Sequence, residues 1–165
     1  MDQDAFRDTY NAVNERRCPY EKSILTGNCA CSRAKRFCIA EREGVCCDAD
    51  DAQARCLAYL EQLRAQARFA LKTTGGHAAL PHAKAMRIQV GGLRGVQATL
   101  EPEGANDPHI DDIDGLLHTA IARFGGLAEL PYQRIIQAVA AYKGRQSFRA
   151  RRLARRQRRD DDEPG

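Results

Sequence analysis

Cysteine is the residue type whose distribution along this chain indicates chemistry. All seven cysteines fall within the 39 residues from 18 to 56, and the rest of the 165-residue chain has none. Thiols used only for packing would be spread through the core, whereas thiols gathered in one stretch indicate a shared partner such as a metal, a cluster or disulfides. The sequence therefore predicts a cofactor region at residues 18–56.

The expected compartment argues against disulfides. Residues 1–8 are rich in acids and are followed by no apolar run as long as that of a signal peptide. No stretch approaches the roughly 18 to 20 apolar residues that a membrane span needs. We therefore expect a cytoplasmic protein without a membrane span. Disulfides rarely persist in the cytoplasm, and seven thiols leave at least one unpaired in any internal scheme.

The intervals between the cysteines favour a cluster over a single ion. They hold ten, one, six, seven, zero and eight intervening residues, and no C-x-x-C pair occurs. Structural zinc sites usually take their ligands from knuckles with about two to four residues between cysteines. An iron–sulfur cluster is larger and accepts thiolates from several separate segments. The sequence predicts an iron–sulfur cluster, specifically a four-cysteine [4Fe–4S] site, with zinc as the alternative cofactor.

Five cysteines are the expected metal ligands, and four of them must be chosen from this set. The five are Cys18, Cys29, Cys31, Cys47 and Cys56. Cys18 precedes Pro19 at a helix break. Cys29, Cys31 and Cys47 stand at predicted helix starts, where free N–H groups and the helix dipole lower the pKa of a thiol. Cys56 reaches the site from the apolar face of a long helix, or is an ordinary core thiol. Cys38 is expected in the core. Of the adjacent residues Cys46 and Cys47, only one can point at the site.

Two functions from different classes fit such a site. The first is an iron–sulfur protein for electron transfer or redox sensing, acting as an accessory subunit or redox partner of an oxidoreductase. Since no catalytic constellation stands out, we expect no catalytic activity of its own. The second is a zinc-stabilised binding module whose arginine-rich tail engages nucleic acid. Thiol–disulfide exchange by activated thiols is a further alternative, although it lacks the usual C-x-x-C motif.

The basic residues are concentrated near the C-terminus. Residues 143–159 hold nine Lys or Arg and no acid, and residues 160–163 are all acidic. The remaining 17 basic and 18 acidic residues make residues 1–142 almost neutral. We expect 143–165 to form a solvated, partly disordered helical tail that could bind nucleic acid through its phosphates.

Apolar periodicity predicts a mainly α fold: one small helical domain at residues 1–142, followed by the basic tail. Helical spacing recurs at about 3–17, 20–26, 29–43 and 49–72, and again in a C-terminal pair within 110–142. Alternating apolar and polar residues on either side of 91–95 predict a short β-hairpin over about 86–100. A helix from Leu93 is the alternative there. Acids near 111–114 are expected to oppose a helix dipole.

Overall fold

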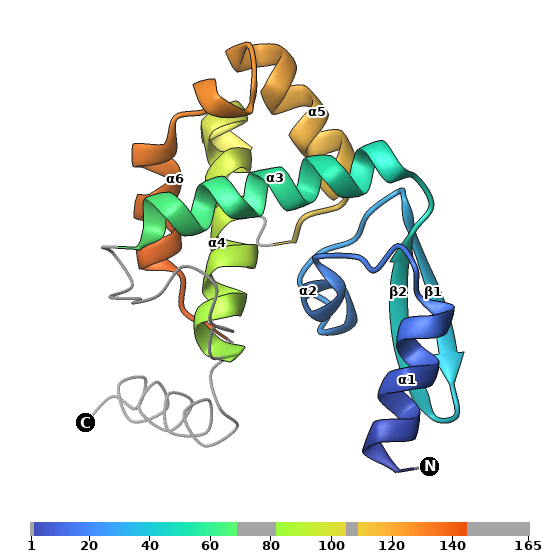
Figure 1. The fold of residues 1–165 in the computed structure, drawn as a ribbon. Helices are drawn as coiled ribbons and strands as arrows, with labels where there is room; N and C mark the ends of the chain where they lie inside the picture. Colours follow the sequence, from blue (N-terminus) through green and yellow to red (C-terminus); the bar gives the residue numbers. More distant parts are fainter. Residues whose placement is uncertain (1, 69–81, 105–108, 145–165) are drawn as a thin grey trace, which may run out of the picture.

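The fold is mainly helical, as the sequence predicts (Figure 1). The computed structural model describes residues 2–68, 82–104 and 109–144. Its elements in chain order are α1 (Gln3–Val13), α2 (Glu21–Leu25), β1 (Ala34–Ile39), β2 (Arg42–Cys47), α3 (Asp50–Ala67), α4 (His82–Leu100), α5 (Ile113–Phe124) and α6 (Tyr132–Ala141). Single 3-10 turns occur at Pro102–Gly104 and Leu127–Glu129. None of the described helices is both long and apolar enough to cross a membrane.

Helices α3 to α6 build the larger part of the core. In Figure 1 the long helix α3 crosses α4, and α6 lies against α4. Two α4 glycines permit this close approach: a Cβ added at Gly91 or Gly95 would lie 2.9 Å from the Cα of Val139 or Ile135 respectively. The fully buried apolar side chains at this junction include Leu63, Leu93, Val96, Leu117 and Ile135.

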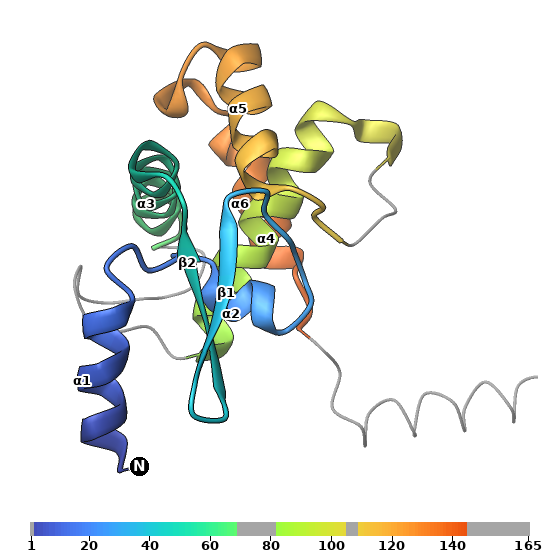
Figure 2. The same cartoon turned by 90° about the vertical axis from the view of Figure 1, so that its right-hand side faces the viewer.

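The N-terminal part is organised around the antiparallel hairpin of β1 and β2. Helix α1 contacts β1, while α2 and the start of α3 contact β2 (Figures 1 and 2). The register pairs Ala34 with Cys47 at the open end and Ile39 with Arg42 beside the turn. The turn places Ala40 at φ 54°, a left-handed conformation that reverses the chain within two residues.

Two predicted elements are wrong. The predicted helix at 29–43 is replaced by a loop and the hairpin, because residues 34–39 pair with 42–47 and gain ladder hydrogen bonds that local periodicity does not reveal. The predicted hairpin at 86–100 is helix α4, so the helical alternative holds from Leu93 onward. The glycines that suggested a turn there instead allow helix packing. The predicted tail spans residues 143–165, and its residues from 145 onward lie outside the described residues.

The contact between α4 and α6 can be tested at Gly95. We expect Gly95→Ala to lower the free energy of unfolding by about 1–2 kcal/mol, because its Cβ would press on the backbone of Ile135 and overpacking outweighs the better helix propensity of alanine. The measurement is urea unfolding. Gly144→Ala is the control, since no atom lies within 4 Å of a Cβ at Gly144. An equal effect of both substitutions would contradict the packing argument.

Candidate functional site

Four cysteines from four separate segments line one pocket. They are Cys18 in the loop before α2, Cys31 in the loop before β1, Cys47 at the end of β2 and Cys56 in α3. Three of them are only 8 % exposed and Cys31 is partly buried. The site therefore lies just beneath the surface. Its other walls are mainly apolar and include Pro19, Ala34, Ala52 and Ile113.

Strand β2 positions two of these thiols through hydrogen bonds on both of its edges. One edge pairs with β1. On the other edge, the Cys18 N–H donates to the Val45 carbonyl at 3.1 Å, and the Cys47 N–H donates to the Arg16 carbonyl at 2.8 Å. Residues 16–18 thus lie beside β2 as a third extended segment. This pairing brings Cys18 and Cys47, which are far apart in sequence, to the same end of the hairpin.

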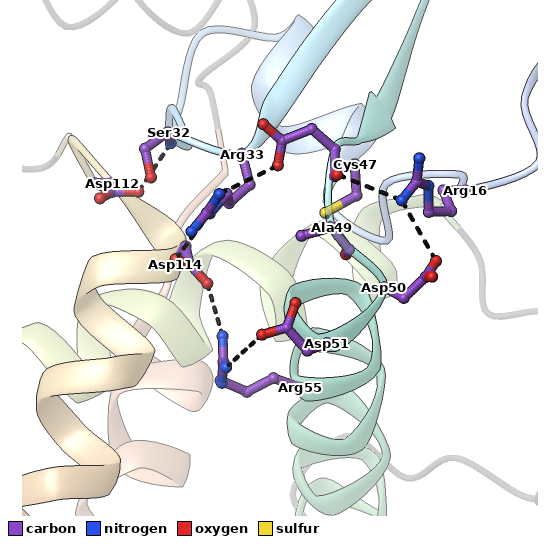
Figure 3. Close-up of polar contacts among 11 residues, drawn as sticks. Arg16, Ser32, Arg33, Cys47, Ala49, Asp50, Asp51, Arg55, Asp112 and Asp114 are labelled. Atoms are coloured by element: carbon purple, nitrogen blue, oxygen red, sulfur yellow. Dashed lines mark hydrogen bonds and ion pairs between the residues drawn. The ribbon is translucent and has the colours of Figure 1, made fainter.

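The loop that carries Cys31 is attached to the beginning of α5. The Ala30 N–H donates to the Ile110 carbonyl at 2.8 Å, and the Ile113 N–H donates back to the Ala30 carbonyl at 3.0 Å. The Ser32 N–H donates to Asp112 Oδ1 at 2.9 Å, as Figure 3 shows. These bonds hold Cys31 against the segment that also supplies pocket residues from α5.

Helix α3 supplies the fourth thiol. The side chain of Gln53 donates a hydrogen bond to the Arg17 carbonyl at 3.0 Å, which ties the first turns of α3 to the segment beside β2. Cys56 follows one turn later on the buried face of the helix. The sequence predicts that Cys56 reaches a buried site from the apolar face of its helix, and the structure places it in the pocket wall.

Backbone N–H groups point at two of the thiols. The Tyr20 N–H is hydrogen-bonded to the sulfur of Cys18, and the N–H groups of Arg33 and Asp114 are hydrogen-bonded to the sulfur of Cys31. The Cys47 thiol itself donates to the Ala49 carbonyl at 3.3 Å (Figure 3). Such N–H donors stabilise a thiolate over a thiol, so the two segments are prepared for negatively charged sulfur.

Burial nevertheless favours the protonated form of Cys18, Cys29, Cys31 and Cys56. It raises the pKa of Cys18 and of Cys29 to about 12 and raises the pKa of Cys56 as well. Burial also raises the pKa of Cys31, against the effect of its N–H donors. The expectation that helix starts would lower these pKa values is wrong, because Cys29 and Cys31 begin no helix and desolvation dominates. Thiols in this state are poor nucleophiles at neutral pH.

Paired arginines and carboxylates border the pocket, and the sequence analysis did not find them. The buried Asp114 lines it and accepts from Arg55 Nη1 at 2.7 Å (Figure 3). Arg33 Nε lies 3.7 Å from Asp114 Oδ2, and Arg33 Nη1 lies 3.7 Å from Asp48 Oδ1. The only sequence signal for Asp114 was its place at a helix start, which is equally explained by the dipole.

The other three cysteines do not line the pocket. Cys29 is 3 % exposed, and its thiol lies close enough to Cys18 and Cys31 for negative charge on either to raise its pKa. The Cys46 thiol is directed elsewhere and donates to the Lys35 carbonyl at 3.6 Å. Cys38 is exposed on β1, so its predicted place in the core is wrong. The structure thus brings together four of the five predicted ligands and leaves Cys29 next to them.

The space between the four thiols is small. The cavity has a volume of about 10 Å³, which is about what a single water molecule needs. Within the described ranges, no group of three or more His, Cys, Asp or Glu side chains is arranged to hold one metal ion. Any larger group would have to push the thiols apart, and Cys31 is the least buried of them.

The chain matches no protein-family model, no curated protein and no solved structure. Its function is therefore argued from its own residues. The decisive geometry is the convergence of four thiols from separate segments, with backbone donors aimed at two of them.

The buried ion pair can be tested with Asp114→Asn. Loss of the carboxylate leaves Arg55, whose side chain is 16 % exposed, with Asp51 at 3.8 Å as its remaining carboxylate partner among the described residues. We expect a loss of about 2 kcal/mol in the free energy of unfolding, measured with urea on the metal-free protein. Asp4→Asn is the matched control, because its pair with Arg7 is exposed and should contribute little. Equal effects would show that Asp114 is not an important structural partner.

The raised pKa values predict a loss of stability in alkali. Unfolded thiols ionise near their ordinary pKa of 9.0, whereas folded Cys18 and Cys29 remain protonated up to about 12. Their contribution is present below pH 9 and is lost as the pH rises toward the folded pKa. Unfolding of the metal-free protein should therefore become easier above pH 9, by at most about 1.4 kcal/mol per pH unit for each thiol. Cys18→Ala should reduce this slope, and an unchanged slope would contradict the assignment.

Proposed function

We propose that this protein binds a [4Fe–4S] cluster and uses it for electron transfer or redox sensing, as the partner or accessory subunit of an oxidoreductase. The proposed ligands are Cys18, Cys31, Cys47 and Cys56. The single observation that carries the proposal is that these four thiols, and none of the other three, line one shared pocket. Four protein thiolates are the usual ligand set of such a cluster.

A cluster suits this ligand arrangement better than zinc does. A structural zinc ion draws four donors to within about 2.3 Å of one point, and the described side chains form no such group. The irons of a cluster occupy separate corners, so its thiolates can approach from different segments. The four cysteines do so, from two loops, a strand end and a helix.

The polar groups around the pocket also suit a negatively charged cluster. Hydrogen bonds to sulfur are among the features that set the potential of a cluster, and backbone N–H groups already point at Cys18 and Cys31. Arg33 and Arg55 stand beside the pocket through their pairs with Asp114. Their positive charge would offset part of the charge that four thiolates and a cluster bring into a buried site.

The small cavity implies that loading is coupled to movement and proton release. The thiols must separate and ionise, so protons leave as the cluster enters. Because burial raises the pKa of Cys18 to about 12, loading should be favoured by alkaline pH until the fold itself loses stability. Cys31 is the most accessible of the four thiols, so it would be the first to meet incoming iron and sulfide.

The use of the cluster follows from its complete ligand set and its depth. When bound, the cluster supplies one-electron redox chemistry, and four protein ligands would leave no iron open to a substrate. Cys18, Cys47 and Cys56 are each 8 % exposed, so the cluster edge would lie near the surface, within reach of a partner protein. Electron exchange fits this placement better than substrate turnover.

Reconstitution without oxygen tests the proposal. The protein is incubated with iron and sulfide, and then its visible absorbance and its iron, sulfide and zinc contents are measured. We expect brown protein with about four irons and four sulfides per chain. Alanine at any one of the four proposed ligands should abolish retention, because each anchors a different corner.

Matched controls come from the three remaining cysteines. Cys38→Ala and Cys46→Ala should keep the cluster, since their thiols lie away from the pocket. Cys29→Ala should also keep it and shows whether that neighbouring thiol can substitute as a ligand. Colourless protein that takes up about one zinc per chain would instead support the zinc-stabilised binding module. Equal loss from all seven substitutions would reject the ligand set.

A further inference from the structure

A buried tyrosine hydroxyl at the pocket has no hydrogen-bond partner. Tyr20 is 0 % exposed, and its hydroxyl is unpaired among the residues that the structure describes. Tyr20 also lines the cysteine pocket. Buried hydroxyl groups are normally paired, because an unpaired one loses its bond to water without replacement. This hydroxyl is therefore expected to find its partner in something that the protein binds.

Two other tyrosines show the usual arrangement. Tyr59 is also 0 % exposed, and its hydroxyl donates to the Gly92 carbonyl at 2.8 Å. The hydroxyl of Tyr132 donates to the Leu127 carbonyl at 2.6 Å. The fold therefore satisfies the hydroxyls of Tyr59 and Tyr132, whereas the described residues leave that of Tyr20, beside the thiols, unpaired.

Tyr20 lines the same pocket as the four thiols. Burial raises its pKa, and so does negative charge on the surrounding Tyr59, Cys56, Cys29 and Cys18. A tyrosine hydroxyl is both a donor and an acceptor, so the unpaired Tyr20 hydroxyl has a proton to offer to a group bound in this pocket. Its backbone is held as well, since the Tyr20 N–H is bonded to the sulfur of Cys18 and the Tyr20 carbonyl accepts from the Ile24 N–H at 2.9 Å.

We propose that the Tyr20 hydroxyl donates a hydrogen bond to a sulfur atom of the bound cluster and thereby raises its reduction potential. This inference rests on the proposed cluster. Reduction adds negative charge to the cluster sulfurs, so a donor aimed at them stabilises the reduced form more than the oxidised form. Tyr20 acts here as a tuning residue and is not a ligand.

The test is a redox titration of the reconstituted Tyr20→Phe protein. Removing the hydroxyl should shift the equilibrium toward the oxidised form by about tenfold, which lowers the midpoint potential by about 59 mV for one electron. Tyr59→Phe is the matched control, because it removes a hydroxyl that is already paired with Gly92. Its potential should equal that of the parent protein.

Tyr20→Phe and Tyr59→Phe should also differ in their effect on the stability of the metal-free protein. Tyr20→Phe should unfold at the same or a higher urea concentration than the parent, since it removes an unpaired group, whereas Tyr59→Phe should unfold at a lower one. A loaded Tyr20→Phe protein with an unchanged potential would overturn this inference while leaving the proposed cluster intact. The inference would also be overturned if Tyr20→Phe destabilised the metal-free protein as much as Tyr59→Phe does. Failure of the parent protein to bind any cluster would overturn the proposed function itself.

Discussion

Hydrogen bonding along both edges of β2 is the constraint on which the sulfur positions depend. Because one edge pairs with β1 and the other with residues 16–18, Cys18 and Cys47 emerge side by side from distant parts of the chain. Helix α3 begins three residues after Cys47 and returns Cys56 over the same end. Only Cys31 depends on a contact outside this unit, the one between its loop and the start of α5. A two-stranded hairpin is marginal alone, so its flanking helices and the bonded segment are needed to keep three of the four thiols together.

The charge balance of the pocket would differ between the empty protein and one that holds the proposed cluster. In the empty protein, burial raises the pKa of Cys18, Cys31 and Cys56, and the charges of Arg33 and Arg55 are offset by Asp114, Asp48 and Asp51. Loaded, the same walls would surround several negative sulfurs, and the arginines would then face anions on two sides. Because the buried Asp114 carboxylate holds two guanidinium groups next to the thiols, positive charge would already be in place for the proposed cluster. Such preorganised charge costs less than recruiting it during binding.

Sequence reasoning located the candidate site better than the backbone that forms it. The clustering of thiols between residues 18 and 56 is a local signal, and four of the five chosen cysteines converge. Cys31 reaches the pocket, however, from a loop tied to α5, about eighty positions later, rather than from a helix start. The role of Asp114 is equally non-local, because its partners Arg33 and Arg55 belong to other elements. Spacing alone cannot reveal which distant segments will pair.

Helix α4 shows that a local pattern can also predict the wrong element. Alternation of Met86, Ile88 and Val90 with polar residues fits a strand, but α4 is buried around most of its circumference, Gln89 included, so its apolar residues follow no single stripe. Glycines that look like turn residues are required instead by the backbone of α6, which approaches too closely for a Cβ. A helix surrounded by others loses the periodicity that identifies it, whereas α5 and α6, each with one exposed face, keep theirs and were predicted. Local patterns are therefore most informative for helices at the periphery and least informative for a central helix such as α4, whose glycines are explained by partners distant in sequence.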